Sequence, residues 1–313
     1  MPDQEARPLI VATAPLTYFQ AIVIGILQGI TELFPISSLG HSVLVPELLG
    51  WDKLVTGQSA DESFFLAFLV GLHVATAIAL LVYFRRDWAD VIAGFFSSIR
   101  KRRIDTPAER MAWLLVVGTI PVGIVGLVFE HDLRTIFAKP TAAAIFLTIN
   151  GLILLAGERL RRRAEVRALV LTHEHHADAG NDVGRDLDTL QLGEGVFIGS
   201  AQILALFAGI SRSGVTMVAG LLRGLDHEDA MRFSFMLATP IILAAGVYKL
   251  PDLLGHDGDH VRGQVLVGSV AAGIAAYLAV RFLDRYFRTR TLTPFAIYCL
   301  VVGVGMIVYI SAT

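Results

Sequence analysis

Residues 28–41 read Gln-Gly-Ile-Thr-Glu-Leu-Phe-Pro-Ile-Ser-Ser-Leu-Gly-His, a polar stretch inside an apolar segment. Residues 202–216 read Gln-Ile-Leu-Ala-Leu-Phe-Ala-Gly-Ile-Ser-Arg-Ser-Gly-Val-Thr, and an offset of 174 residues aligns the two stretches. Around them 7 of 26 aligned positions are identical, mostly helix breakers and polar residues. Charged and hydroxyl side chains at membrane depth are costly and mark functional sites. Broken apolar segments at matching places in two halves indicate where such a site lies.

The composition is that of a polytopic membrane protein. The 313 residues are 54% hydrophobic and 17% charged, with a mean hydropathy of +0.63, whereas a soluble domain carries about 25% charged residues. The net charge of -2 gives no electrostatic case for binding nucleic acid. The single cysteine, Cys299, excludes an internal disulfide and a cysteine-based metal site.

Six apolar runs are long enough to cross a membrane as helices. They cover about 64–84, 111–130, 141–158, 232–249, 263–283 and 292–311. The two motif segments, about 17–49 and 194–224, are instead broken near their middles. Each is either a full span followed by a loop or a re-entrant hairpin of two half-helices.

Basic residues favour the hairpins. Arginine and lysine gather in linkers 85–110, 159–193 and 281–291, and are sparse in connections 50–62, 131–140 and 250–262. The positive-inside rule places the basic linkers in the cytoplasm. Segment 194–224 must then enter and leave on the cytoplasmic side, and by repeat symmetry the first motif segment forms a hairpin from the outside.

The sequence therefore predicts an all-α polytopic membrane protein with six transmembrane helices and two re-entrant helical hairpins in inverted-topology repeats. Repeat 1 covers about 17–158, repeat 2 about 194–311, and a cytoplasmic linker about 159–193, within one integral membrane domain. The hairpin tips are expected to meet near the midplane, because non-helical backbone there must be buried in protein or face water.

The first tip carries groups for anion and metal binding. Gln28 and Glu32 lie four residues apart, which puts them on one face of a half-helix. Ser37 and Ser38 are suited to capping the next half-helix, whose free N–H groups attract anions. His41 follows Ser38 by about one turn and is expected to reach the same place.

The second tip supplies a permanent positive charge. Gly209 permits an unusual turn, and Ser211 and Ser213 are expected to cap the following helix. Arg212 offers a planar guanidinium suited to phosphate oxygens, and Thr216 adds a hydroxyl one turn later.

These groups together predict phosphoryl chemistry on a substrate with a lipid tail. The phosphate-binding residues are expected to be Ser37, Ser211, Arg212, Ser213 and Thr216. Glu32 with Gln28 suits a hard divalent cation, Mg²⁺ or Ca²⁺. Ser38 beside His41 is a hydroxyl with a base, or His41 takes the phosphoryl group or activates water. The sequence does not choose among these mechanisms.

The runs Gln28-x-x-x-Glu32, Pro35-Ile-Ser-Ser-Leu-Gly-His41 and Gly209-Ile-Ser-Arg-Ser-Gly-Val-Thr216 resemble the signature motifs of the undecaprenyl-diphosphatase family of bacitracin-resistance proteins. The helix pattern over most of the chain, including Thr293-Pro-Phe-Ala-Ile-Tyr298, is also similar. The resemblance implies hydrolysis of undecaprenyl diphosphate to undecaprenyl phosphate and inorganic phosphate, which recycles the lipid carrier of cell-wall synthesis. It also implies a divalent cation, a bacterial cell membrane and a site open to the extracytoplasmic side.

Carried over by position, the catalytic residues are expected to be Ser38, His41, Glu32 and Arg212. Gln28 stands where the family's first acidic residue is usual, and Ala208 replaces the proline before Gly209. His73, inside run 64–84, is either a partner of the site or an interhelical hydrogen-bonding residue.

The alternative function is a polyprenyl-phosphate transporter or flippase, because inverted repeats with broken helices are a transporter architecture. The pairing of Ser38 with His41 favours the enzyme, since carriage needs no nucleophile. The expected partners are the polyprenyl diphosphate substrate and membrane lipids, with no nucleic acid, and a homodimer is left open.

Overall fold

The computed structural model describes residues 16–51, 64–137, 139–173, 185–254 and 261–312, and these contain helices and loops with no β-strand. The α-helices are α1 (Tyr18–Thr31), α2 (Ser38–Leu48), α4 (Phe64–Tyr83), α5 (Arg85–Lys101), α6 (Pro107–Phe137), α7 (Pro140–His173), α8 (Leu192–Ser200), α9 (Arg212–Leu222), α10 (His227–Leu254), α11 (Arg262–Tyr286) and α12 (Thr293–Ala312). Two short 3-10 helices, η2 (Leu187–Thr189) and η3 (Ala201–Leu206), flank α8. The predicted all-α class is confirmed.

Five helices are long and apolar enough to cross a membrane by themselves: α6, α7, α10, α11 and α12. A sixth span is reached if α4 and α5 are counted together, although the two are bent by 88° relative to each other. The chain is therefore a multi-pass membrane protein. The histidine-rich stretch 174–184 that follows α7 lies outside the described residues.

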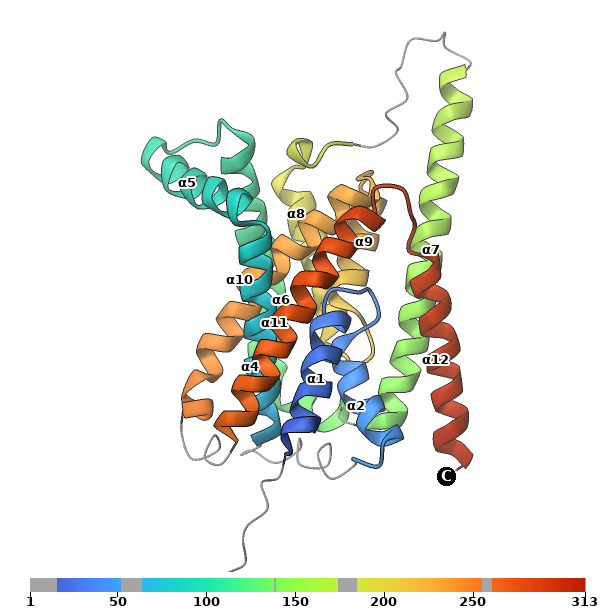
Figure 1. Ribbon diagram of the computed structural model, residues 1–313. Helices are drawn as coiled ribbons and strands as arrows, with labels where there is room; N and C mark the ends of the chain where they lie inside the picture. The colour runs from blue at the N-terminus through green and yellow to red at the C-terminus, as the bar shows by residue number, and fades with distance from the viewer. Residues whose placement is uncertain (1–15, 52–63, 138, 174–184, 255–260, 313) are drawn as a thin grey trace, which may run out of the picture.

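Both motif segments are broken helices, as predicted. The first consists of α1 and α2, separated by residues 32–37, and the second of α8, η3 and α9. The offset of 174 residues that aligns the motifs also carries the bounds of α2 onto those of α9. The outer ends of α1 and α2 lie at one end of the bundle (Figure 1), where Phe19 and Trp51 are in ring contact.

The second broken segment starts and finishes at the opposite end. Seven residues before α8, the backbone N–H of Arg185 donates to the carbonyl of Gly224, two residues after the end of α9 (2.9 Å). Figure 1 shows α5, the C-terminal end of α7 and the C-terminal end of α11 at this same end. Ion pairs connect the region, since Arg232 of α10 contacts Asp87 of α5 and Arg288 lies 3.5 Å from Glu228. The basic ends of these helices therefore share one end of the molecule.

Apolar packing holds the broken segments inside the bundle. α1 packs against α11, and α9 packs against α7 and α10. Most buried apolar side chains form one cluster around α9, α10 and the facing sides of α6, α7 and α12, and a smaller cluster lies between α1, α4 and α11. The non-helical tips of both segments are thus enclosed by helices, which is where irregular backbone is tolerated at membrane depth.

Candidate active site

The two loops that interrupt the broken helices touch each other. The backbone N–H of Gly209 donates to Ser37 Oγ (3.1 Å), and Ser213 Oγ donates to the Phe34 carbonyl (3.3 Å). From α7, Asn150 joins both loops, because its Nδ2 donates to the Pro35 carbonyl (3.0 Å) and its Oδ1 accepts from the Ser211 N–H (2.9 Å). The expectation that the tips meet is confirmed.

A residue with positive φ at each tip allows the two loops to approach this closely. Ser37 has φ of 71°, a region that non-glycine residues rarely adopt, and it caps α2 by accepting from the Gly40 N–H (3.2 Å). Gly209 has φ of 114°, and a Cβ atom there would lie 2.4 Å from the Ala143 carbonyl oxygen. Such conformations persist only where the surroundings enforce them, and they cluster at functional sites.

Helix α9 begins with the capping expected from the sequence at Ser211. Its Oγ accepts from the Gly214 N–H (3.1 Å). Ser213 lies inside the first turn of α9, with its hydroxyl 3.0 Å from Ser211 Oγ. Both α2 and α9 therefore start where the loops meet.

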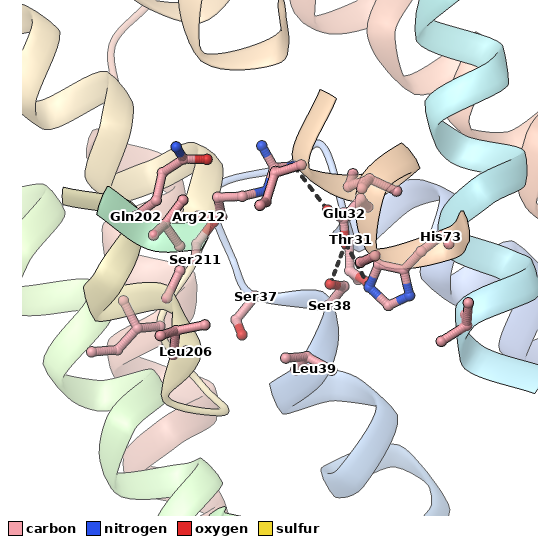
Figure 2. A pocket seen from close by; sticks show the side chains of 18 residues that line it. Thr31, Glu32, Ser37, Ser38, Leu39, His73, Gln202, Leu206, Ser211 and Arg212 are labelled. Atoms are coloured by element: carbon pink, nitrogen blue, oxygen red, sulfur yellow. Dashed lines mark hydrogen bonds and ion pairs between the residues drawn. The ribbon is translucent and has the colours of Figure 1, made fainter. Parts of the chain in front are cut away.

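The carboxylate of Glu32 is contacted by residues from both repeats (Figure 2). Its Oε1 accepts from Arg212 Nη2 (2.8 Å), and its Oε2 accepts from Ser38 Oγ (2.5 Å) and Gln28 Nε2 (3.0 Å). His73 Nε2 of α4 lies 3.3 Å from the same Oε2. Glu32 is only 7% exposed, so its charge requires these partners. Four residues from three separate segments are thereby held around one carboxylate.

A cavity of about 270 Å³ lies beside this carboxylate. The polar part of its lining comes from the two broken segments and from His73, and the remaining lining is mainly apolar. The lining residues are Thr31, Glu32, Ser37, Ser38, Leu39, Val70, His73, Val122, Gln202, Ala205, Leu206, Ile210, Ser211, Arg212, Ile241, Ile242, Ala245 and Gly246. Two of these carry buried polar atoms with no hydrogen-bond partner among the described residues, Nη1 of Arg212 and Oε1 of Gln202. A guanidinium nitrogen without a hydrogen-bond partner among the described residues, on a side chain that lines the cavity, is suited to an anionic oxygen.

Four residues expected at the site are absent from the cavity lining: Gln28, His41, Ser213 and Thr216. His41 is buried but is not part of the cavity lining: its Nδ1 donates to the Ser37 carbonyl (2.7 Å), which leaves Nε2 to accept from the Tyr298 hydroxyl (2.9 Å). Thr216 is likewise absent from the lining, and its hydroxyl lies 2.5 Å from Ser234 Oγ. The structure thus brings Ser38, Glu32 and Arg212 together at the cavity. His41 instead contacts Ser37 and Tyr298 outside the cavity lining.

The oxygen donors suit a divalent cation that is held mainly by its substrate. Among the described residues, no group of three or more His, Cys, Asp or Glu side chains could hold a metal by itself. Glu32 supplies one carboxylate, and beside it Gln28 Oε1 is buried without a hydrogen-bond partner in the described part of the chain. Mg²⁺ commonly binds through one or two protein oxygens together with substrate phosphates, so the donor set fits.

Three residues at the site were not assigned a role from the sequence. Gln202 aligns with Gln28 in the repeat, and this alignment was a usable signal. His73 could only be recognised as an intramembrane ionisable residue with an open role. Asn150 gave no signal, because its hydrogen-bond partners in the two loops lie 115 and 61 residues away in the chain.

Comparison with known proteins places the chain in a family. The family described as bacitracin resistance protein BacA matches residues 21–305. A protein named undecaprenyl-diphosphatase from Mycolicibacterium paratuberculosis is 60% identical over 96% of this chain and 99% of its own length. Undecaprenyl-diphosphatase 2 of Frankia alni is 58% identical over 92% of this chain and 96% of its own, and that of Chromobacterium violaceum is 43% identical over 91% and 96%. The chain belongs to the bacitracin resistance protein BacA family.

Proposed function

We propose that this chain hydrolyses undecaprenyl diphosphate to undecaprenyl phosphate and inorganic phosphate, returning the lipid carrier to cell-wall synthesis. Its relatives carry the name undecaprenyl-diphosphatase. The observation that carries the proposal is the cavity in which Ser38, Glu32 and Arg212 converge within apolar walls. The polar groups suit a diphosphate and the walls suit its prenyl tail.

Arg212 binds the terminal phosphate in this account. Its Nη2 is held by Glu32, so the guanidinium is fixed in orientation, while Nη1 remains for a phosphate oxygen. Helices α2 and α9 begin at the loops that line the cavity, and their free N–H groups and positive dipole ends favour an anion. Charge that develops on the transferred phosphoryl group is stabilised by these preorganised donors.

Ser38 is the nucleophile we infer from the geometry. Its Oγ attacks the terminal phosphorus and forms an O–P bond, while its proton passes to Glu32 Oε2, 2.5 Å away. The bond from phosphorus to the bridging oxygen breaks, and that oxygen leaves with its electron pair as part of undecaprenyl phosphate. Water then attacks the phosphorus of the phosphoserine. The bond between phosphorus and Ser38 Oγ breaks as Glu32 returns its proton to Ser38, and inorganic phosphate leaves with both protons of the water.

The two histidines support this reaction in different ways. His73 contacts the carboxylate that accepts the serine proton, so it positions Glu32 and balances its charge. His41 holds the carbonyl of Ser37 directly before the nucleophile, and we assign it a positioning role in place of general base. A divalent cation held by Glu32, Gln28 and the diphosphate would neutralise phosphate charge in the transition state.

The membrane arrangement we propose has six crossings and two re-entrant hairpins, one from each side, in a bacterial cell membrane. The shared basic end of α5, α7 and α11 supports a cytoplasmic face there. The cavity is lined by Val70 near the start of α4 and by Ala245 and Gly246 late in α10. These lie toward the opposite end, which supports an opening on the extracytoplasmic side.

Phosphate release from a polyprenyl diphosphate by the purified protein tests the function. We expect turnover in the native protein and a loss of at least about 10³-fold in Ser38→Ala. Ser311→Ala, on the exposed end of α12, is the matched control and should keep full activity. Lipid transport without phosphate release in proteoliposomes would overturn the proposal in favour of the flippase.

A further inference from the structure

A basic pocket lies at the C-terminal end of α11, on the outer surface of the molecule. The cavity measures about 500 Å³, and three arginines line it together with Phe282 and Tyr286: Arg281, Arg285 and Arg290. All three arginines are exposed, and no ion pair involves them within the described residues. Arg288 in the same stretch instead lies near Asp284 (3.3 Å) and Glu228 (3.5 Å). The pocket thus gathers three uncompensated positive charges.

An apolar groove continues from this pocket toward the middle of the bundle. It has a volume of about 490 Å³, lies between α1 and α11, and has almost no polar surface. Ile26, Ile30 and Phe34 form one wall and Ile274 stands on the other. Leu278 lines both the groove and the basic pocket, so the two lie next to each other.

We propose that the basic pocket and the adjacent groove together bind one anionic phospholipid of the cytoplasmic leaflet, with its phosphate among the three arginines and an acyl chain in the groove. Basic pockets at the cytoplasmic ends of membrane helices attract anionic headgroups. An acidic protein segment would use the arginines but would leave the groove unfilled. Only the assignment of the leaflet rests on the membrane orientation proposed above.

The groove also reaches the catalytic loop. The ring of Phe34 stacks on Phe282 of the basic pocket, with centroids 5.8 Å apart and planes 4° from parallel. The carbonyl of Phe34 accepts from Ser213 Oγ and Ser211 Oγ in the contact between the two loops. A lipid that packs against Phe34 therefore restrains the loop that carries Glu32 and Ser38.

Native mass spectrometry of the purified full-length protein with phosphatidylglycerol or phosphatidylcholine tests the headgroup site without any substrate. The test variant is Arg281→Gln/Arg285→Gln/Arg290→Gln, and the control is Arg86→Gln/Arg100→Gln/Arg163→Gln, which removes the same charge from exposed positions elsewhere. We expect the test variant to bind phosphatidylglycerol roughly tenfold or more weakly, with the control unchanged. Equal losses in both variants, or a retained preference in the test variant, would overturn the site, whatever the phosphatase assay shows.

A second pair of variants tests the groove. Ile274→Trp fills the groove from an exposed position, and Val270→Trp places the same side chain one turn away on α11, outside the groove lining. We expect Ile274→Trp to weaken phosphatidylglycerol binding and Val270→Trp to leave it intact. Unchanged binding in Ile274→Trp would contradict an acyl chain in the groove.

Discussion

At the scale of single residues, the proposed mechanism depends most on Glu32. One buried carboxylate accepts from Ser38, Gln28 and Arg212 and contacts His73, so it joins the proposed nucleophile to the proposed phosphate-binding group. A buried charge is stable only when its hydrogen-bonding capacity is filled. The same contacts that stabilise Glu32 therefore fix the geometry of the reaction.

His73 provides the first prediction at this scale. His73→Leu removes a partner of the buried carboxylate, and we expect kcat to fall roughly 10- to 100-fold with a smaller change in KM. His73→Gln can still donate to Glu32 and should restore part of the loss. Steady-state phosphate release measures both variants, and full activity in His73→Leu would remove His73 from the site.

His41 gives a prediction that separates positioning from base catalysis. His41→Asn places an amide N–H where Nδ1 lies and keeps a donor for the Ser37 carbonyl, so we expect activity within about tenfold of the native protein. A histidine that acts as general base cannot be replaced by an amide. If His41→Asn is as inactive as Ser38→Ala, the base role belongs to His41.

Local spacing made some of these contacts predictable. The four-residue separation of Gln28 and Glu32 predicted a shared helix face, and their side chains are hydrogen-bonded. The internal repeat predicted that Arg212 would approach the first motif, and it contacts Glu32. The direction of His41 was not predictable, because its partner Tyr298 lies 257 residues away.

At the scale of elements, the function depends on two interrupted helices whose loops bind each other. The capping serines Ser37 and Ser211 followed from sequence, because hydroxyl residues before a helical turn satisfy its free N–H groups. The apolar runs predicted α4, α6, α7, α10, α11 and α12, but not α5 as a helix of its own. Its polar and apolar residues are mixed, and hydropathy alone reads such a segment as a linker.

Gly209 tests the contact between the loops. We expect Gly209→Ala to destabilise the protein by about 2 kcal/mol or more, because φ there is positive and the added Cβ meets backbone. Gly193→Ala, in an open place on α8, is the matched control and should leave the melting temperature unchanged or slightly higher. Equal melting temperatures for the two variants would show that the tight loop contact is absent.

At the scale of the whole molecule, the proposed re-entrant hairpin has both ends of the second broken segment on one side of the membrane. Cys299 is buried, so single cysteines can be introduced at exposed positions with little background: Leu49, Gln191 and Arg223. A membrane-impermeant maleimide applied to intact cells should label Leu49→Cys alone. Gln191→Cys and Arg223→Cys should both react only after permeabilisation. If one of the two is labelled in intact cells and the other is not, the second broken segment crosses the membrane fully.

In the proposed mechanism, the two repeats form one catalytic site through the contact between Glu32 and Arg212. A double-mutant cycle of phosphate release measures this directly, using Glu32→Gln, Arg212→Gln and the combined variant. We expect each single change to lower kcat/KM by roughly 100-fold or more, and the double variant to be little less active than the less active single variant. Losses that simply multiply in the double variant would show that the two residues act independently and would contradict the account.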